Sequence, residues 1–275
     1  MGSGRSSDID ASLFDASIFK HSASWGADER QWVAARFQVV ANQLANADPQ
    51  WAAWGRRELA SGVGEALVDA VGWDSGAPSA TLKAGYDRIR QPGVKVRLGQ
   101  VFTPAPLARL LARISLSNQW RWPEPTILDP ACGAGSLLVA AAEWRFSCGL
   151  DASAAIADLE GWDRDPVAAW LCRAALVEWA LSKGGAVPAP LRIFGGVDAL
   201  NPGPLDHPVG AWICNPPYLE AKRMGRAEPG LRDRLRRVFP ELKGAWDLYL
   251  AFCLRALAQV GEGGSIGLLL PNKVL

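Results

Sequence analysis

Residues Ile127-Leu128-Asp129-Pro130-Ala131-Cys132-Gly133-Ala134-Gly135-Ser136 combine a short apolar run, an acidic residue and a glycine turn. Glycine permits positive φ and close backbone approach, so this stretch predicts a strand over 126–129, a tight turn and the start of a helix. The free N–H groups at the start of a helix can bind a polar ligand. The same turn also joins strands to helices in α/β proteins that bind no ligand there. The motif alone leaves both interpretations open.

Short apolar runs alternate with helical periods from Gly99 onward, a pattern typical of βαβ units and a parallel sheet. We therefore expect an α/β, Rossmann-like sheet of about five parallel strands in a domain over residues 96–275. A smaller, mostly helical region is expected over residues 1–95, with helices starting at Asp28 and over 49–71. The further expected strands are 159–163, 191–196, 209–215 and 265–271, and the expected helices lie near 135–147, 165–182 and 245–260.

Acidic residues follow two more of the expected strands. Asp163 ends the second strand, and an acidic side chain there can accept hydrogen bonds from both ribose hydroxyls of a nucleoside cofactor. Asp165 and Pro166 suit the N-cap and first turn of the next helix. Asp198 follows the third strand in the same way, although an ordinary loop aspartate is the alternative there.

Asn215-Pro216-Pro217-Tyr218 follows the fourth expected strand directly. Two prolines remove two N–H donors and fix φ, so Asn215 Oδ1 and the Pro216 carbonyl can both accept hydrogen bonds from one amino group. Tyr218 can stack on a planar base. This arrangement suits methyl transfer to an exocyclic amine and needs neither a metal nor a nucleophilic side chain. A simple turn after a strand is the alternative.

The formal net charge of +1 argues against a protein that coats nucleic acid through bulk charge. The segment Ala221–Lys243, however, carries eight Lys or Arg against three acidic residues, and it follows the Asn215 turn. These cations could pair with phosphates, or they could belong to a solvated basic helix. The residues predicted to contact DNA are Lys222, Arg223, Arg234, Arg236 and Arg237.

Cysteine, histidine and apolar patterns argue against metal, disulfide and membrane classes. The five cysteines form no CxxC pair and the two histidines are far apart, so we expect no metal site and no disulfide framework. No apolar run reaches membrane-spanning length, and the N-terminus lacks the pattern of a secretion signal. We therefore expect a cytoplasmic protein.

Residues 96–275 resemble the amino-group DNA methyltransferases that use S-adenosylmethionine, specifically the N6-adenine group of restriction-modification systems with the Asn-Pro-Pro-Tyr motif. The segments that carry this resemblance are Gly99–Pro104, Asp129–Gly135, Asn215–Tyr218, Asp247–Phe252 and the pair Gly263-Gly264.

The resemblance implies methyl transfer from S-adenosylmethionine to the N6 amino group of an adenine flipped out of double-stranded DNA. It implies that Phe102 and Thr103 contact the methionine part of the cofactor, and Thr103 with Pro104 could also open the helix that follows. Asp129 would lie near the ammonium group, Asp163 would bind the ribose and Asp198 the adenine amino group. The expected catalytic residues are Asn215, Pro216, Pro217 and Tyr218, and the expected cofactor-binding residues are Phe102, Thr103, Asp129, Ala131, Gly133, Gly135, Asp163, Arg164, Asp198 and Asn215.

The sheet of this family has seven strands and is followed by a target-recognition domain. This sequence ends after the fifth expected strand. We therefore expect a shortened chain, or a piece that a second chain completes with target recognition. Two other functions stay open at this point. One is methylation of an RNA base or a protein glutamine, and the other is a non-catalytic, methyltransferase-like subunit.

Overall fold

The computed structural model describes Lys83 and residues 103–118, 125–185, 191–201 and 207–272. The chain divides into two units, Met1–Ile89 and Arg90–Leu275, and every helix and strand below belongs to the second. The helices expected at Asp28 and over 49–71, and the candidate Phe102, lie outside the described residues. The expected boundary at residue 95 stays a prediction.

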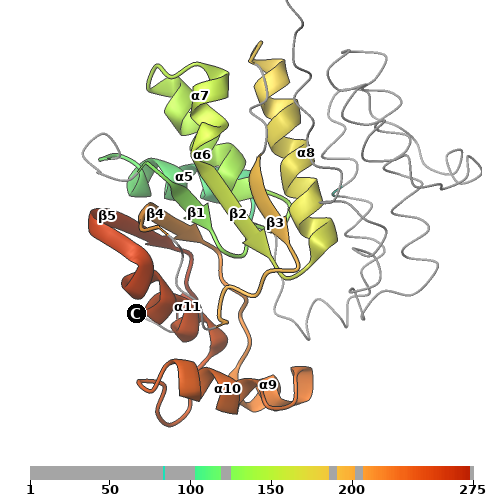
Figure 1. Cartoon of the computed structure of the whole chain (residues 1–275), viewed down its shortest axis with the longest axis vertical. Helices are drawn as coiled ribbons and strands as arrows, with labels where there is room; N and C mark the ends of the chain where they lie inside the picture. The colour runs from blue at the N-terminus through green and yellow to red at the C-terminus, as the bar shows by residue number, and fades with distance from the viewer. Residues whose placement is uncertain (1–82, 84–102, 119–124, 186–190, 202–206, 273–275) are drawn as a thin grey trace, which may run out of the picture. The chain divides into compact units, whose positions relative to one another are not determined.

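The described residues form a parallel five-stranded sheet in the order β3-β2-β1-β4-β5 (Figure 1). This arrangement confirms the predicted α/β, Rossmann-like fold class. Because β1 lies at the centre and the chain moves outward on both sides of it, the loops after β1 and β4 are neighbours in space. The strands are β1 (Ile127–Asp129), β2 (Leu159–Asp163), β3 (Arg192–Gly195), β4 (Val209–Cys214) and β5 (Val260–Leu268).

Side chains that alternate along the strands divide the core between the two faces of the sheet. Ile127 and Ile213 pack with the helices of one face, while Leu128 and Trp212 pack with those of the other. The first face is covered by α5 (Ala105–Ser115), α6 (Ser136–Ser147), α7 (Ala152–Ala157) and α8 (Pro166–Ser182). The second face is covered by α11 (Leu248–Gln259), while α9 (Ala221–Ala227) and α10 (Leu231–Val238) lie beyond the carboxyl ends of the strands and share its apolar cluster.

Strand β5 begins five residues earlier than expected and ends at Leu268. Its first half is rich in glycine, which conceals its strand character in the sequence. A Cβ on Gly264 would lie 2.6 Å from the carbonyl oxygen of Gly210 in β4, so the two backbones approach more closely than a side chain allows. A register shift between Val209 and Ala211 accommodates this irregular pairing.

Two helix starts also differ from expectation. Helix α5 begins at Ala105 with Pro104 as its N-cap, so the expected N-cap role of Thr103 is wrong by one residue. Helix α7 was not expected, because it has only six residues. Its sequence signal is Asp151, whose side chain accepts a 2.8 Å hydrogen bond from the N–H of Ala154. Among the described residues, no helix is long and apolar enough to cross a membrane.

Candidate active site

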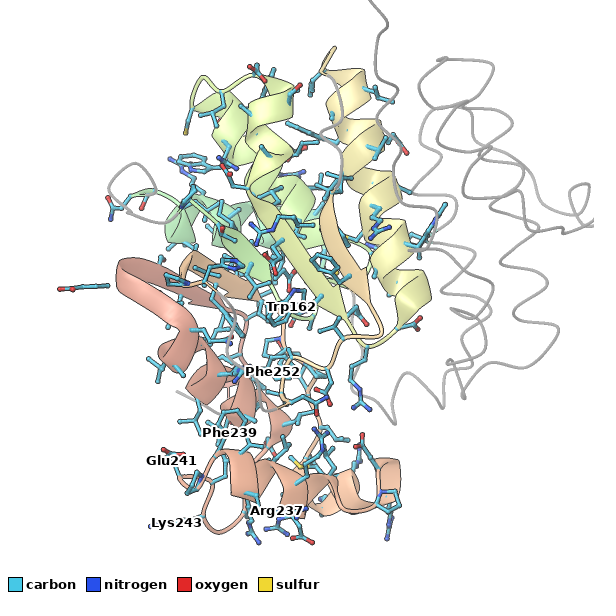
Figure 2. The ribbon with its side chains drawn as sticks, viewed as in Figure 1. Trp162, Arg237, Phe239, Glu241, Lys243 and Phe252 are labelled. Atoms are coloured by element: carbon cyan, nitrogen blue, oxygen red, sulfur yellow. The ribbon has the colours of Figure 1, made fainter. Side chains whose placement is uncertain are left out.

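The carboxyl ends of β1, β2, β3 and β4 bring the predicted site residues to one edge of the sheet. The parallel registers set Asp129 opposite Gly161 and Asp163 opposite Gly195. Since parallel strands end on the same edge, the loops that follow them share that edge. Figure 2 shows Trp162, the residue before Asp163, near the centre of this region.

The glycine turn after β1 is held by a carboxylate from β2. Asp163 Oδ2 accepts a 2.9 Å hydrogen bond from the N–H of Gly133, and Oδ1 accepts a 2.7 Å bond from the N–H of Asp165. Gly135 has φ 83° and is the N-cap of α6. A Cβ on Gly135 would lie 2.9 Å from Cys172 Sγ, so both its conformation and its surroundings require glycine. Asp163 therefore fixes the turn that it borders.

Asp129 is a buried carboxyl at the end of β1. It is 1% exposed, and its Oδ1 accepts a 3.1 Å hydrogen bond from the N–H of Ala131. Burial raises the pKa of the Asp129 carboxyl from 3.8 to about 8, the bond from Ala131 opposes this rise, and the charge of Asp163 adds to it. Within the described part of the chain, Asp129 has no basic partner. A cationic group bound here would favour its ionised form.

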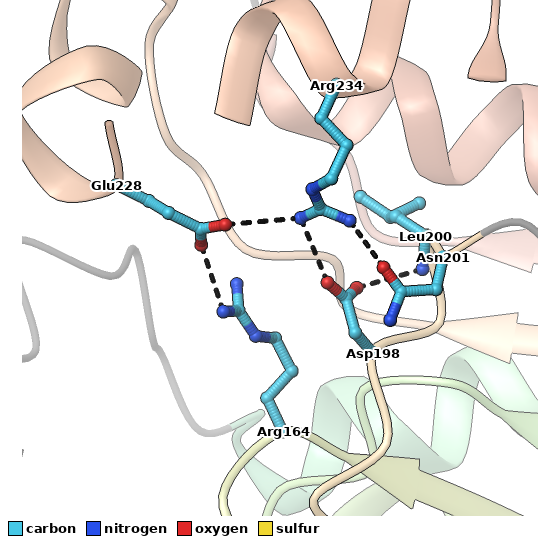
Figure 3. A network of polar contacts seen from close by, with 6 residues as sticks. All are labelled: Arg164, Asp198, Leu200, Asn201, Glu228 and Arg234. Atoms are coloured by element: carbon cyan, nitrogen blue, oxygen red, sulfur yellow. Dashed lines mark hydrogen bonds and ion pairs between the residues drawn. The ribbon is translucent and has the colours of Figure 1, made fainter. Parts of the chain in front are cut away.

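Asp198, after β3, lies in a different environment. Its Oδ1 accepts a 3.0 Å hydrogen bond from the N–H of Leu200, and its Oδ2 forms a 3.0 Å ion pair with Arg234 of α10. Arg234, a candidate DNA contact, thus lies in a polar network with a candidate cofactor ligand (Figure 3). Sequence reasoning missed this pairing because the two residues are 36 positions apart.

The amide of Asn215 is oriented by two neighbours. Its Nδ2 donates a 3.0 Å hydrogen bond to Thr103 Oγ1, while its Oδ1 lies 2.7 Å from the hydroxyl of Tyr218. That hydroxyl also lies 2.9 Å from the carbonyl oxygen of Leu269, just after β5. Burial raises the pKa of Tyr218, so its hydroxyl remains a donor. With Thr103 Oγ1 accepting and the Tyr218 hydroxyl donating, the amide oxygen of Asn215 lies on the Tyr218 side.

The Asp247–Phe252 segment contacts the residues that follow the turn at Asn215–Tyr218. Asp247 Oδ1 accepts a 3.2 Å hydrogen bond from the N–H of Ala221, at the start of α9. The N–H of Leu248 donates to the carbonyl of Leu219 at 2.9 Å. Tyr249 and Phe252 are buried. The motif that sequence reasoning used only as a family signature therefore ties α9 and α11 to the residues after Tyr218.

The five predicted DNA contacts do not share one environment. Lys222 and Arg223 are exposed and lie near Glu220, whereas Arg236 donates a 3.0 Å hydrogen bond to the carbonyl of Gly244. Arg237 is exposed and makes no polar contact within the described residues. Figure 2 shows it on the side of α10 that faces away from the sheet. Arg234 contacts Asp198 and Asn201, which follow β3 (Figure 3).

The site thus combines charged and neutral acceptors. The carboxyl groups of Asp129, Asp163 and Asp198 each accept from a backbone N–H, and their remaining lone pairs can accept from a cationic, hydroxyl-rich ligand. The Asn215 turn offers neutral oxygen acceptors to an amino group. Within the ranges that the structure describes, no group of three His, Cys, Asp or Glu side chains is placed to hold a metal ion.

Comparison with known proteins gives matches in both sequence and structure. A family model described as N-6 DNA Methylase matches residues 93–275. The type II methyltransferase M.BanIII of Aneurinibacillus aneurinilyticus is 30% identical over 155 residues, which cover 54% of this chain. The match spans 25% of that relative's length.

Two solved structures of low sequence identity share the fold. A protein of Listeria monocytogenes described as a class I S-adenosylmethionine-dependent methyltransferase is 15% identical, with a TM-score of 0.54 over 96% of this chain and 73% of that one. The type IIG restriction endonuclease BpuSI is 17% identical, with a TM-score of 0.51 over 96% of this chain and 33% of that one. At these identities the likeness establishes the fold alone.

Proposed function

The chain belongs to the N-6 DNA methylase family, and we propose that it methylates the N6 amino group of adenine in DNA. Membership of this family confirms the predicted enzyme class and the predicted cofactor, S-adenosylmethionine. The observation that carries this proposal is the Asn215 amide, oriented by Thr103 and Tyr218 beside the strand-end carboxylates. We place the activity in a restriction-modification system, in line with the description of the type II relative.

The residues present fit the cofactor. Asp129 is a buried carboxyl without a basic partner in the described residues, which suits the ammonium group of the methionine part. Asp163 would bind the ribose hydroxyls and Asp198 the adenine amino group, with the backbone of Ala131 and Gly133 and the side chain of Arg164 around them. Thr103 would contact the methionine part, and so would Phe102. When bound, the cofactor supplies an electrophilic methyl group on a sulfonium centre.

Asn215 and Pro216 would activate the target amine. An exocyclic amine is a poor nucleophile because its lone pair is delocalised into the ring. Hydrogen bonds from its two N–H groups to Asn215 Oδ1 and the Pro216 carbonyl would hold the nitrogen so that its lone pair points at the methyl group. The same acceptors stabilise the positive charge that develops on the nitrogen.

Tyr218 would stack on the flipped adenine. Its hydroxyl is held near Asn215 Oδ1 and the carbonyl of Leu269, so the ring is attached to the ends of both β4 and β5. Pro217 fixes the chain between these residues. Extruding the base from the duplex costs roughly a few kcal/mol, and stacking on Tyr218 offsets part of it.

We propose that the exposed cations after this turn, including Lys222, Arg223 and Arg237, contact DNA phosphates. Arg234 and Arg236 make contacts within the chain, so they would contribute mainly to the shape of this surface. Target recognition by a further segment or a second chain fits the larger size of the type II relative, of which the match spans 25%. A cytoplasmic location fits a DNA substrate.

An activity assay on Asn215→Ala tests the proposal. Removing the amide acceptor should lower methyl transfer by about 100- to 1,000-fold, the typical effect of deleting one group that stabilises transition-state charge. Affinity for S-adenosylmethionine should change by less than about threefold, since the amide acts on the amine. The measurement is tritiated-methyl incorporation with DNA, RNA and protein supplied as separate acceptors, alongside calorimetric cofactor titration.

Asn118→Ala is the matched control, because Asn118 is exposed just beyond α5. It should leave both quantities unchanged. Turnover of Asn215→Ala equal to wild type would contradict the catalytic role. Incorporation into RNA or protein instead of DNA would select the other substrate class, and cofactor binding without any transfer would support a non-catalytic subunit.

A further inference from the structure

Arg234 connects α10 to the loop that follows β3. One guanidinium nitrogen, Nη2, lies 3.0 Å from Asp198 Oδ2 and 3.3 Å from Glu228 Oε1. The other, Nη1, donates a 2.6 Å hydrogen bond to Asn201 Oδ1. Figure 3 shows these side chains converging on one guanidinium from three directions. Both terminal nitrogens of the planar guanidinium therefore make polar contacts.

Glu228 extends this network to the neighbouring strand. While its Oε1 contacts Arg234, its Oε2 lies 2.9 Å from Nη2 of Arg164. Arg164 directly follows Asp163 at the end of β2, and Asp198 follows β3. The segment that carries α9 and α10 is thus bound to both loops in which the ribose and adenine ligands are proposed to lie.

The contact to Asp198 is the most enclosed part of the network. The side chains of Asp198 and Arg234 are 16% and 26% exposed, whereas Arg164 is 57% exposed. Asp198 is held on both oxygens, since Leu200 donates to Oδ1 and Arg234 contacts Oδ2. A carboxylate offers about four lone-pair sites, so it can still accept from a ligand. The carboxylate is therefore fixed in direction and still able to bind.

We propose that Arg234 is a positioning residue for the cofactor's base: it holds the Asp198 carboxylate toward the 6-amino group of the cofactor adenine. This inference rests on the proposed function, because it takes the adenine site of the cofactor as given. Arg234 lies in α10, in the segment that follows the turn at Asn215–Tyr218. By this proposal, a residue of that segment helps to select the base of the cofactor. The role of Arg234 differs from that of a phosphate-binding surface cation.

Base discrimination by the cofactor site tests the proposal. The ligands are S-adenosylhomocysteine and its deaminated analogue, in which an oxygen replaces the 6-amino group. Wild type should prefer the amino ligand, because the oxygen of the analogue would face the carboxylate of Asp198. Arg234→Met should weaken binding of the amino ligand by about tenfold, the effect of one charged hydrogen bond, and change binding of the analogue by less than about twofold.

Arg237→Met is the matched control on the same helix, since Arg237 is exposed and makes no polar contact in the described residues. It should leave both affinities unchanged. Arg234→Lys keeps the charge but loses the fork, so it should retain part of the discrimination. This second variant keeps the test decisive if Arg234→Met does not fold.

The outcomes separate the two claims. Equal losses for both ligands in Arg234→Met and Arg234→Lys would show a purely structural role and overturn the inference. Unchanged discrimination in both variants would also overturn it, while leaving the proposed function intact. Failure of folded wild type to bind S-adenosylhomocysteine would instead contradict the proposed cofactor site, and the inference with it.

Discussion

The two halves of the sheet edge use different chemistry. The proposed cofactor half, formed by Asp129, Asp163 and Asp198 after β1, β2 and β3, consists of carboxyl groups that accept from backbone N–H groups. The proposed catalytic half, formed by Asn215 and Tyr218 after β4 together with Thr103, consists of neutral amide and hydroxyl groups. The sheet brings both halves to one edge.

This difference corresponds to the charge of what each half would bind. A cofactor with an ammonium group and ribose hydroxyls is matched by carboxylates. An amine that is neutral before the reaction and cationic as the methyl is transferred is matched by neutral acceptors, which strengthen as the charge develops. Within the cofactor half, the carboxylates also differ, since Asp198 is paired with Arg234 and Asp129 is buried without a basic partner in the described residues.

The largest effect in the cofactor half is expected at Asp163. Asp163→Ala removes the acceptor of the proposed ribose hydroxyls, so S-adenosylmethionine affinity should fall by about 100-fold, roughly tenfold for each of two charged hydrogen bonds. Calorimetric titration measures this loss. The N–H groups of Gly133 and Asp165 also lose their acceptor, so the melting temperature should fall as well.

Asp163→Asn separates these two effects. It keeps one side-chain oxygen as an acceptor and removes the charge, so it should melt closer to wild type than Asp163→Ala while still binding the cofactor weakly. Wild-type affinity in a folded Asp163→Ala chain would mean that this carboxylate supports only the glycine turn. The cofactor half would then lose its central member.

A pH dependence is expected from Asp129. Its pKa of about 8 means that the carboxyl is neutral at pH 6 in the ligand-free protein. A bound ammonium group favours the carboxylate, so affinity should rise with pH between about 5.5 and 7.5, by at most about tenfold per unit. Above this range the α-amino group of the cofactor itself loses its proton, since its ordinary pKa is about 7.7–8.0.

Asp129→Asn is the control, because the amide does not titrate. Its affinity should match wild type near pH 5.5 and show no rise from this group. Stability gives a second measurement without cofactor. The folded chain binds a proton here that the unfolded chain releases above about pH 4, so wild-type stability should decrease as pH rises from about 4 to 8. The same pH slope in Asp129→Asn would contradict the assignment.

Much of this edge could be predicted from local sequence. The strand-turn-helix pattern at 126–136 and the acids that end the next two expected strands are short-range signals, and the structure places them at neighbouring strand ends. The expected strands correspond to β1 to β5, although β5 starts early because Gly264 packs against the β4 backbone. Because glycine has no side chain, a glycine-rich strand lacks the apolar pattern that indicates a strand in the sequence.

The contacts that orient the site could not be predicted in this way. The pair Asn215 and Thr103 is separated by 112 positions, and Arg234 lies 36 positions from Asp198. Charge composition does not separate the cations after Tyr218, because only the fold brings acidic and amide partners to Arg234. Arg234 therefore faces the loops while Arg237, three residues later, is exposed.

The smallest expected effect concerns the hydrogen bond that orients Asn215. Because α5 begins at Ala105, Thr103 is free to accept from Asn215 Nδ2. Thr103→Val keeps the shape but removes this acceptor, so the amide can turn and present Nδ2 to the amine. We expect kcat to fall by about fivefold, the effect of one neutral hydrogen bond.

Thr103→Ser restores the hydroxyl and should recover most of this rate. The cofactor Kd should change less than kcat in Thr103→Val, because the affected group acts on the amine. A loss confined to cofactor affinity, with kcat preserved, would leave Thr103 only its proposed contact with the methionine part of the cofactor. The boundary between the charged and neutral halves would then lie between Thr103 and Asn215.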